Sequence, residues 1–181
     1  MKRLTALAVL ALCPLAASAA PLDLGPYGTF QVTPPAGWTL SSQKVADSGY
    51  TLTLSPPGDL NAKCIINVTF VPDPQPVSKE KIQEEVLDVS DQFVEQSVEK
   101  KKVIRELSVP GGAYGCYCVF NDASMVGKPS KHDEFKVIAV GIVQYDDKVM
   151  AAFSVAADDE KGPDFASMLA AVSGSTLRPK K

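Results

Sequence analysis

The residues best suited to chemistry in this 181-residue chain are a few cysteines and a single histidine, His132. Cys116 and Cys118 lie two positions apart, and Cys64 precedes them in the chain. Three thiolates would suit a soft metal such as copper(I) or zinc. In an oxidising compartment, two of the thiols could instead form a disulfide. The single histidine excludes sites that need several imidazoles, such as a His₃ zinc centre.

The spacing of the cysteines favours some of these interpretations over others. In a strand, Cys116 and Cys118 would point to the same face with Cα atoms about 6.5 Å apart, which is poor geometry for a disulfide. A disulfide between Cys64 and either Cys116 or Cys118 is favoured, provided that their strands are neighbours. The alternative is a small-ligand or soft-metal site at Cys116 and Cys118. However, Tyr114 and Phe120 would share their face, which indicates a buried core.

Catalytic motifs are absent from the sequence. There is no Gly-x-Ser-x-Gly elbow, P-loop, dinucleotide fingerprint or His-Glu-x-x-His motif. His132 lies in a polar segment beside Asp133 and Glu134, which favours an exposed loop residue. A cysteine hydrolase would require His132 to reach Cys116 or Cys118, and thiols that face a core are usually inert. We therefore predict a protein that is not an enzyme and that has no cofactor.

The N-terminus has the three parts of an export signal. Lys2 and Arg3 precede an apolar stretch at residues 4–15, and small residues occupy positions 17–19. This pattern predicts a Sec signal peptide, residues 1–19, cleaved after about Ala19. The apolar stretch is too short to anchor the chain across a bilayer core of about 30 Å. The predicted location is the periplasm of a Gram-negative bacterium, or the medium outside the cell.

A lipoprotein is the alternative to a cleaved soluble form, because Cys13 follows the apolar stretch. Lipoprotein processing requires a small residue before the cysteine, and Leu12 occupies that place.

Removal of Lys2 and Arg3 reduces the 18 basic and 21 acidic residues to 16 and 21, a net charge of −5. This charge, without a basic stripe, excludes a typical nucleic-acid-binding protein.

The remaining chain is predicted to form one domain, residues 20–177, followed by a disordered basic tail, residues 178–181. Alternating apolar residues predict strands, with Cys64, Ile66, Val68 and Phe70 as the clearest case. Helical spacing predicts a long amphipathic helix that begins after Ser78, includes Val89 and Val98 in its apolar stripe and has lysines 100–102 at its end. The other predicted elements are strands at 28–32, 50–54, 103–109, 114–120, 135–144 and 148–156, and a helix at 163–173.

This order of elements predicts an α+β fold in which helices flank an antiparallel sheet. The opening Phe-Gln-Val-Thr-Pro-Pro-Ala-Gly-Trp, residues 30–38, precedes a long charged helix and late paired strands at 137–145 and 149–155. Together these features resemble the PsbP-like fold group, which includes PsbP of photosystem II, a eukaryotic Ran-binding protein and bacterial DcrB-type envelope proteins. The resemblance implies an α/β/α sandwich and a function in binding or assembly.

The sequence therefore predicts a non-enzymatic binding or assembly module for an envelope partner protein. It does not predict the oligomeric state, and no membrane-spanning segment is expected. The residues expected to form partner surfaces are Tyr27, Trp38 and the loop 121–134, with Lys128 and His132 in that loop. Trp38 is equally compatible with a place in the core.

Overall fold

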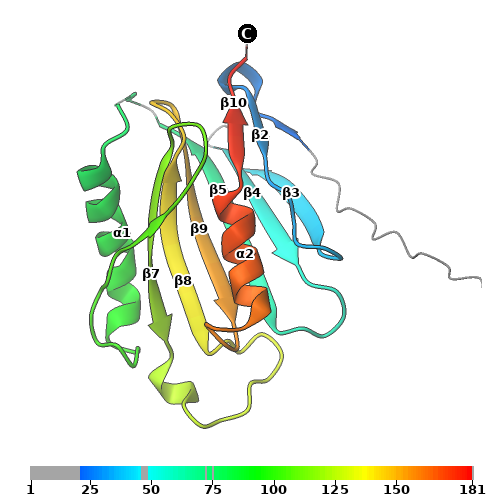
Figure 1. Cartoon of the computed structure of the whole chain (residues 1–181), viewed down its shortest axis with the longest axis vertical. Helices are drawn as coiled ribbons and strands as arrows, with labels where there is room; N and C mark the ends of the chain where they lie inside the picture. The colour runs from blue at the N-terminus through cyan, green and yellow to red at the C-terminus, as the bar shows by residue number, and fades with distance from the viewer. Residues whose placement is uncertain (1–20, 46–48, 72, 75, 181) are drawn as a thin grey trace, which may run out of the picture.

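The structure is a computed structural model that describes residues 21–45, 49–71, 73–74 and 76–180 (Figure 1). The predicted signal peptide, residues 1–19, lies outside the described residues, as does Cys13. None of the described helices is long and apolar enough to cross a membrane.

Most of the described strands form one antiparallel sheet of seven strands in the order β3-β4-β5-β9-β8-β7-β6. A second antiparallel sheet has the order β1-β2-β10. The strands of the large sheet are β3 (Thr39–Val45), β4 (Gly49–Ser55), β5 (Ala62–Phe70), β6 (Arg105–Leu107), β7 (Tyr114–Asn121), β8 (Val137–Gln144) and β9 (Val149–Ala157). Those of the small sheet are β1 (Leu22–Asp23), β2 (Thr29–Gln31) and β10 (Thr176–Arg178).

The two helices cover opposite faces of the large sheet. Helix α1 (Lys79–Val94) packs on β7 and β8, and α2 (Pro163–Ser173) packs on β5 and β9 (Figure 1). Short 3-10 turns, η1 (Gly25–Tyr27) and η2 (Ala123–Met125), complete the described elements. This arrangement confirms the predicted α+β fold, an antiparallel sheet with helices on both faces.

Side-chain alternation divides the interior into two cores. On β5, Cys64, Ile66 and Val68 are buried beneath α2, whereas the residues between them point to the opposite face. On β7, Cys116 and Cys118 are buried beneath α1. The alternation predicted for β5 is therefore confirmed, and the two groups of cysteines lie on opposite faces of the sheet.

Helix α1 begins as predicted but ends earlier. The Ser78 side chain accepts a hydrogen bond from the backbone N–H of Lys81 at 3.4 Å. The helix ends at Val94, so the prediction that Val98 continues its apolar stripe is wrong, and Val98 is 52% exposed. The prediction was also wrong for Val89, which is 43% exposed because Ser90 takes the buried position instead.

The lysines predicted at the end of α1 lie beyond the helix. Lys102 runs back along it and donates to the Leu87 carbonyl at 3.1 Å and to the Asp91 carboxylate at 2.5 Å. These contacts place the positive charge beside the middle of α1, where it pairs with the Asp91 carboxylate. They come from a separate segment, which helical periodicity alone does not distinguish from a longer helix.

Helix α2 has the predicted bounds, 163–173, and leads directly into β10. The last residue of β10, Arg178, pairs with Thr29 of β2. The sequence placed Arg178 in a basic tail, and this boundary is wrong because Arg178 belongs to a strand. Strand pairing over only three residues gives too weak a periodic signal to be recognised from sequence.

Candidate binding site

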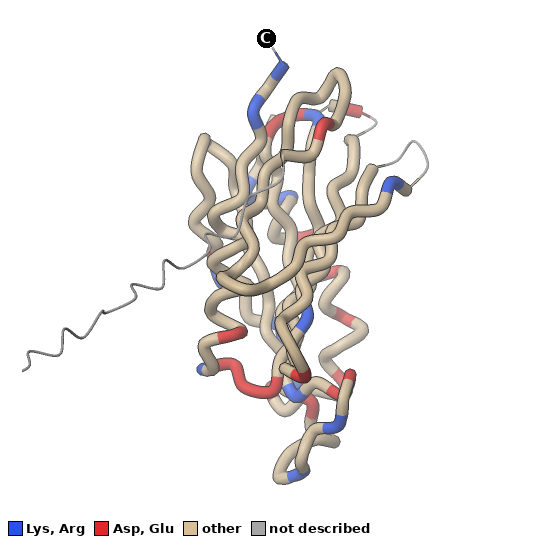
Figure 2. Tube along the Cα trace, turned by 90° about the vertical axis from the view of Figure 1, so that its right-hand side faces the viewer, with Lys and Arg blue, Asp and Glu red and all other residues tan. Residues whose placement is uncertain are grey.

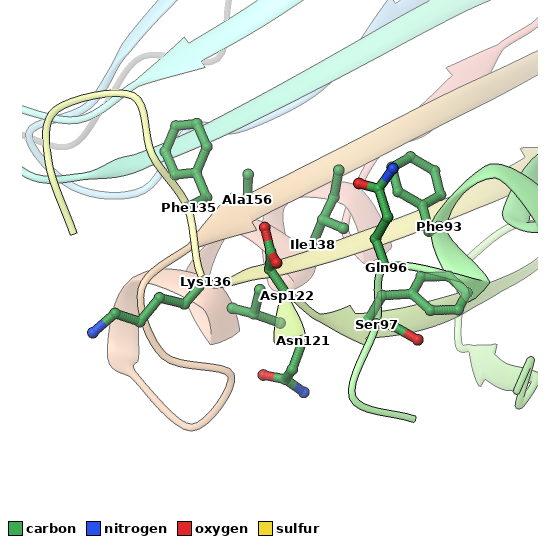
Figure 3. Close-up of a pocket in the computed structure, with 11 residues that line it drawn as sticks. Phe93, Gln96, Ser97, Asn121, Asp122, Phe135, Lys136, Ile138 and Ala156 are labelled. Carbon is green, nitrogen blue, oxygen red and sulfur yellow. The ribbon is translucent and has the colours of Figure 1, made fainter. Parts of the chain in front are cut away.

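A cavity of about 240 Å³ opens at the end of the molecule where α1 ends (Figure 3). The last turn of α1, the end of β7, the start of β8 and the end of β9 meet there (Figure 1). Its lining consists of Phe93, Gln96, Ser97, Phe120, Asn121, Asp122, Phe135, Lys136, Val137, Ile138 and Ala156. Most of this lining surface is apolar, so the cavity favours an apolar occupant.

Three phenylalanines give the cavity its apolar character. The Phe93 ring, from α1, stacks on the Phe120 ring of β7 with centroids 5.7 Å apart and an interplanar angle of 22°. Phe135 precedes β8 and lies across the cavity from Phe93 (Figure 3). Phe120 is buried, whereas Phe93 and Phe135 are half-buried. The two half-buried rings therefore leave apolar surface that a ligand or a partner could cover.

Backbone hydrogen bonds hold the rim of the cavity. The Val98 N–H donates to the Asn121 carbonyl at 2.7 Å, and the Ala123 N–H donates to the Gln96 carbonyl at 2.9 Å. Ser97 forms an isolated bridge with Asp122. The segment that follows α1 is thus fastened to the end of β7, and the cavity is formed before any ligand binds.

Some polar side chains on the rim are hydrogen-bonded to other described residues, and others are not. Asn121 is bonded to Glu99, and Asp122 accepts the Ser124 N–H at 2.7 Å. In contrast, the Gln96 amide and the Lys136 ammonium make no side-chain hydrogen bond or ion pair with any described residue. Figure 3 shows the Gln96 amide beside Phe93 and the Lys136 chain extending away from the rings. These two groups remain available to an occupant.

The loop 122–136 beside the cavity is fixed by Asn61. The Asn61 amide donates to the Glu134 carbonyl at 2.7 Å and to the Asp158 carboxylate at 2.9 Å, and its oxygen accepts the Asp133 N–H at 3.0 Å. We call this end of the molecule, with residues 56–61, 95–98, 122–136 and 158–162, the loop end. Acidic and basic residues are interspersed there (Figure 2).

Exposed apolar side chains accompany the cavity at the loop end. Leu60, Val98 and Val126 are 46%, 52% and 67% exposed, respectively. Val98 is bonded through its backbone to Asn121 of the cavity lining, and Leu60 is next to Asn61 in the chain. Val126 lines a neighbouring hollow that shares Asn121, Asp122 and Lys136 with the cavity. Large exposed apolar side chains at the same end of a molecule as an apolar cavity are typical of a protein-binding surface.

The predicted partner residues lie at two ends of the molecule. Lys128 and His132 are exposed in the loop 122–136, and the His132 Nε2 lies 3.6 Å from the Asp133 carboxylate. Tyr27 belongs to η1, which precedes β2, and β2 lies toward the opposite end of the molecule (Figure 1). The Tyr27 ring stacks on Phe70 with centroids 4.1 Å apart and an interplanar angle of 12°. Their role in partner binding remains a prediction.

Trp38 belongs to the core. It is only 8% exposed and packs within the cluster beneath α2. Its prediction as a partner surface is therefore wrong, and the alternative position, in the core, is the observed one. A tryptophan after a glycine turn has the same sequence pattern in either environment, so only the packing separates them.

The predicted disulfide is incompatible with this topology. Strands β9 and β8 separate Cys64 on β5 from Cys116 and Cys118 on β7. The cysteines also face different cores, and all three are free and buried. The predicted disulfide required β5 and β7 to be neighbouring strands, and they are not. Pairing of Cys64 with Cys116 or Cys118 is therefore wrong for this fold. The same separation prevents the three thiols from binding one metal ion.

The thiols are also poorly suited to chemistry. Burial raises the pKa of Cys64 to about 12. Burial likewise raises the pKa of Cys116 to about 11, although a hydrogen bond from Tyr114 opposes the shift. A thiol that stays protonated at neutral pH is a weak nucleophile and a weak metal ligand. The small-ligand or soft-metal site at Cys116 and Cys118 remains an untested prediction, and these pKa directions argue against it.

Sequence reasoning did not find the cavity. It assigned Phe93 to the apolar stripe of a helix and Phe135 to the start of a strand. One signal in the sequence could have indicated the cavity. Phe135 is a large apolar residue that directly follows a polar loop, outside the regular alternation of the strand. The cavity itself depends on where α1 ends relative to the sheet.

No protein-family model matches the chain, and no curated protein matches it. The solution structure of cyanobacterial PsbP (CyanoP) from Synechocystis sp. PCC 6803 aligns with 97% of this chain and 99% of that chain. The sequences are 10% identical, and the TM-score is 0.49.

Proposed function

We propose that this protein is exported to the periplasm of a Gram-negative bacterium and acts there as a non-enzymatic binding module for an envelope partner protein. Removal of residues 1–19 would release the α+β domain. The partner would dock on the loop end. The observation that supports this proposal most directly is the apolar cavity between Phe93 and Phe135, with exposed apolar side chains at the same end of the molecule.

The size of the cavity favours a protein partner over a free small molecule. Its volume is about 240 Å³, below the roughly 300–1,000 Å³ typical of pockets for drug-sized ligands. A space of this size accommodates one or two apolar side chains inserted by a partner. Such an anchor in a pocket, surrounded by a rim that excludes water, is the usual form of a binding hot spot.

The rim would supply the specificity of the contact. Leu60, Val98 and Val126 provide apolar area outside the cavity. Gln96 and Lys136 provide hydrogen-bond donors that no described residue uses. A partner segment with an apolar anchor and nearby carbonyl or carboxylate groups would match both features.

The lining favours binding over catalysis. Among its described residues there is no cysteine or histidine. His132 is 78% exposed at its side chain, and the raised pKa values of Cys64 and Cys116 keep those thiols protonated. The proposal therefore assigns no reaction to the protein.

Site-specific photo-crosslinking in the native host tests the docking surface. A photoreactive phenylalanine analogue at Val126 should give one discrete adduct, whereas the analogue at Thr53, on β4 of the sheet, should not. Ala156→Phe fills the cavity and should abolish the Val126 adduct. The matched control, Ser154→Phe, adds the same ring on the same strand and face but outside the lining, so it should preserve the adduct.

Two results would overturn the proposal. The docking surface is wrong if the Val126 adduct forms equally with Ala156→Phe and Ser154→Phe. The export step is tested separately by the intact mass of the protein from the periplasm. A mass that retains residues 1–19, or that carries lipid on Cys13, contradicts the cleaved soluble form.

A further inference from the structure

Strand β3 forms one edge of the large sheet. Its seven residues, Thr39–Val45, pair with β4 on one side, and no described strand lies beyond it (Figure 1). Six of the seven residues are exposed, and the seventh, Leu40, is half-buried. Alternate backbone N–H and carbonyl groups of an edge strand point outward and can pair with another strand.

This edge has few of the features that usually protect an edge strand. Natural edges are shortened, charged, bulged or interrupted by proline. The opposite edge, β6, follows this rule: it has three residues and carries Arg105 and Glu106. Strand β3 instead runs in unbroken register with β4, contains no proline and has one charged residue, Lys44.

We propose that β3 pairs with β3 of a second copy of this chain. The pairing is antiparallel about a two-fold axis at Ser42, so that the two sheets join edge to edge. In this register Ser42 lies opposite the partner's Ser42, and Ser41 opposite the partner's Gln43. Leu40 lies opposite the partner's Lys44, and all seven residues of each strand are paired.

The sequence of β3 is self-complementary in this register. Lys44 faces Leu40 of the partner subunit, so no like charges meet, and the aliphatic part of the lysine covers the half-buried leucine. Thr39 faces the partner's Val45, a pair of β-branched residues of the kind that stabilises sheets. A two-fold axis at Lys44 would place the two ammonium groups opposite each other. These pairings favour a second copy as the occupant of the edge.

The contact is small, so the expected state is a reversible monomer–dimer equilibrium. An interface of one seven-residue strand pair falls in the size range of weak, transient complexes, with a dissociation constant in roughly the micromolar range or above. The cavity at the loop end takes no part in this interface. Dimerisation and partner binding can therefore fail or succeed independently.

Paired charge variants test both the interface and its register. Ser42→Lys and Ser42→Glu each place like charges opposite each other at the axis, and each should weaken dimerisation about five- to tenfold in sedimentation equilibrium. An equimolar mixture of the two variants should restore association. Gln92→Lys adds the same charge at an exposed position of α1, outside the proposed interface, and should have little effect.

Three outcomes would overturn the proposal. The first is a wild-type chain, from residue 20 onward, that stays monomeric at about 1 mM, far above the concentration range of a specific weak dimer. The second is a mixture of the Lys and Glu variants that associates no better than either alone. The third is equal weakening by Ser42→Lys and Gln92→Lys. Circular dichroism melting of each variant verifies that the fold is retained.

Discussion

The carboxylate of Glu99 accepts two hydrogen bonds from Asn121, one from the side-chain amide at 2.7 Å and one from the backbone N–H at 3.0 Å. These bonds tie the segment after α1 to the last residue of β7, at the rim of the cavity. Burial of Glu99 raises its pKa, but the two hydrogen bonds outweigh burial, and the pKa lies below its ordinary value.

Glu99→Gln should destabilise the protein at neutral pH by about 1 kcal/mol, because an amide cannot accept both bonds with both of its terminal atoms. The folded-state pKa of Glu99 is lowered, so its stabilisation is present above the unfolded-state pKa of about 4.3 and is lost as the pH falls through the folded value. Urea unfolding of both proteins should thus give free energies that differ at pH 7 and converge as the pH falls through the lowered folded-state pKa of Glu99.

The control for this prediction is Glu95→Gln. Glu95 is exposed and directly follows the last residue of α1. Glu95→Gln removes the same charge from the same segment without removing the hydrogen bonds between Glu99 and Asn121. Equal destabilisation by both variants would contradict the role of the Glu99 hydrogen bonds.

The three cysteines of the domain should be free and protected in the folded protein. Iodoacetamide at neutral pH should leave the native chain unlabelled, because Cys64, Cys116 and Cys118 are buried. After unfolding in denaturant without a reductant, all three should react, as read by intact mass. A single labelled thiol under these conditions would demonstrate a disulfide and contradict the topology.

Gly141 is required by close packing across three strands. An added Cβ would lie 2.5 Å from the Cys116 carbonyl oxygen, 2.5 Å from the Phe153 ring and 2.6 Å from the Tyr117 Cβ. The Tyr117 and Phe153 rings, 6.4 Å apart, lie on either side of this position. Gly141→Ala should therefore destabilise the fold by about 1–3 kcal/mol in chemical denaturation.

A neighbouring glycine provides the comparison for Gly141. At Gly115 the nearest atoms are methyl groups of Val143 and Val109, at 3.0 and 3.3 Å. Side chains can adjust more readily than a carbonyl, so Gly115→Ala should cost clearly less than Gly141→Ala. The reverse order would show that the sheet relaxes around position 141.

Ser90 is the buried polar residue of the apolar face of α1. Its side chain is fully buried, and its hydroxyl has no hydrogen-bond partner among the described residues. Ser90→Ala removes the cost of desolvating the hydroxyl and raises helix propensity. The variant should have an equal or higher melting temperature, with a gain of up to about 1 kcal/mol. A decrease of that size would reveal a hydroxyl contact essential to the packing of α1.

Several features of this protein follow from local sequence alone. Alternation of apolar residues predicted β5 and its buried face, and the bounds of α2 followed from Pro163 and Gly174. These features depend on contacts between near neighbours in the chain and on the side-chain period of each element. The same local rules predict the export signal, which lies outside the described residues.

Other features depended on which distant segments meet. Strand order separates Cys64 from Cys116 and Cys118, and packing puts Trp38 in the core. The early end of α1 at Val94 opens the cavity between Phe93 and Phe135. No local pattern encodes these outcomes, because each depends on which strands become neighbours and on how much of the sheet a helix covers. Local chemistry thus determined the elements and their faces, and long-range packing determined where a cysteine, an aromatic ring or a strand edge is left accessible.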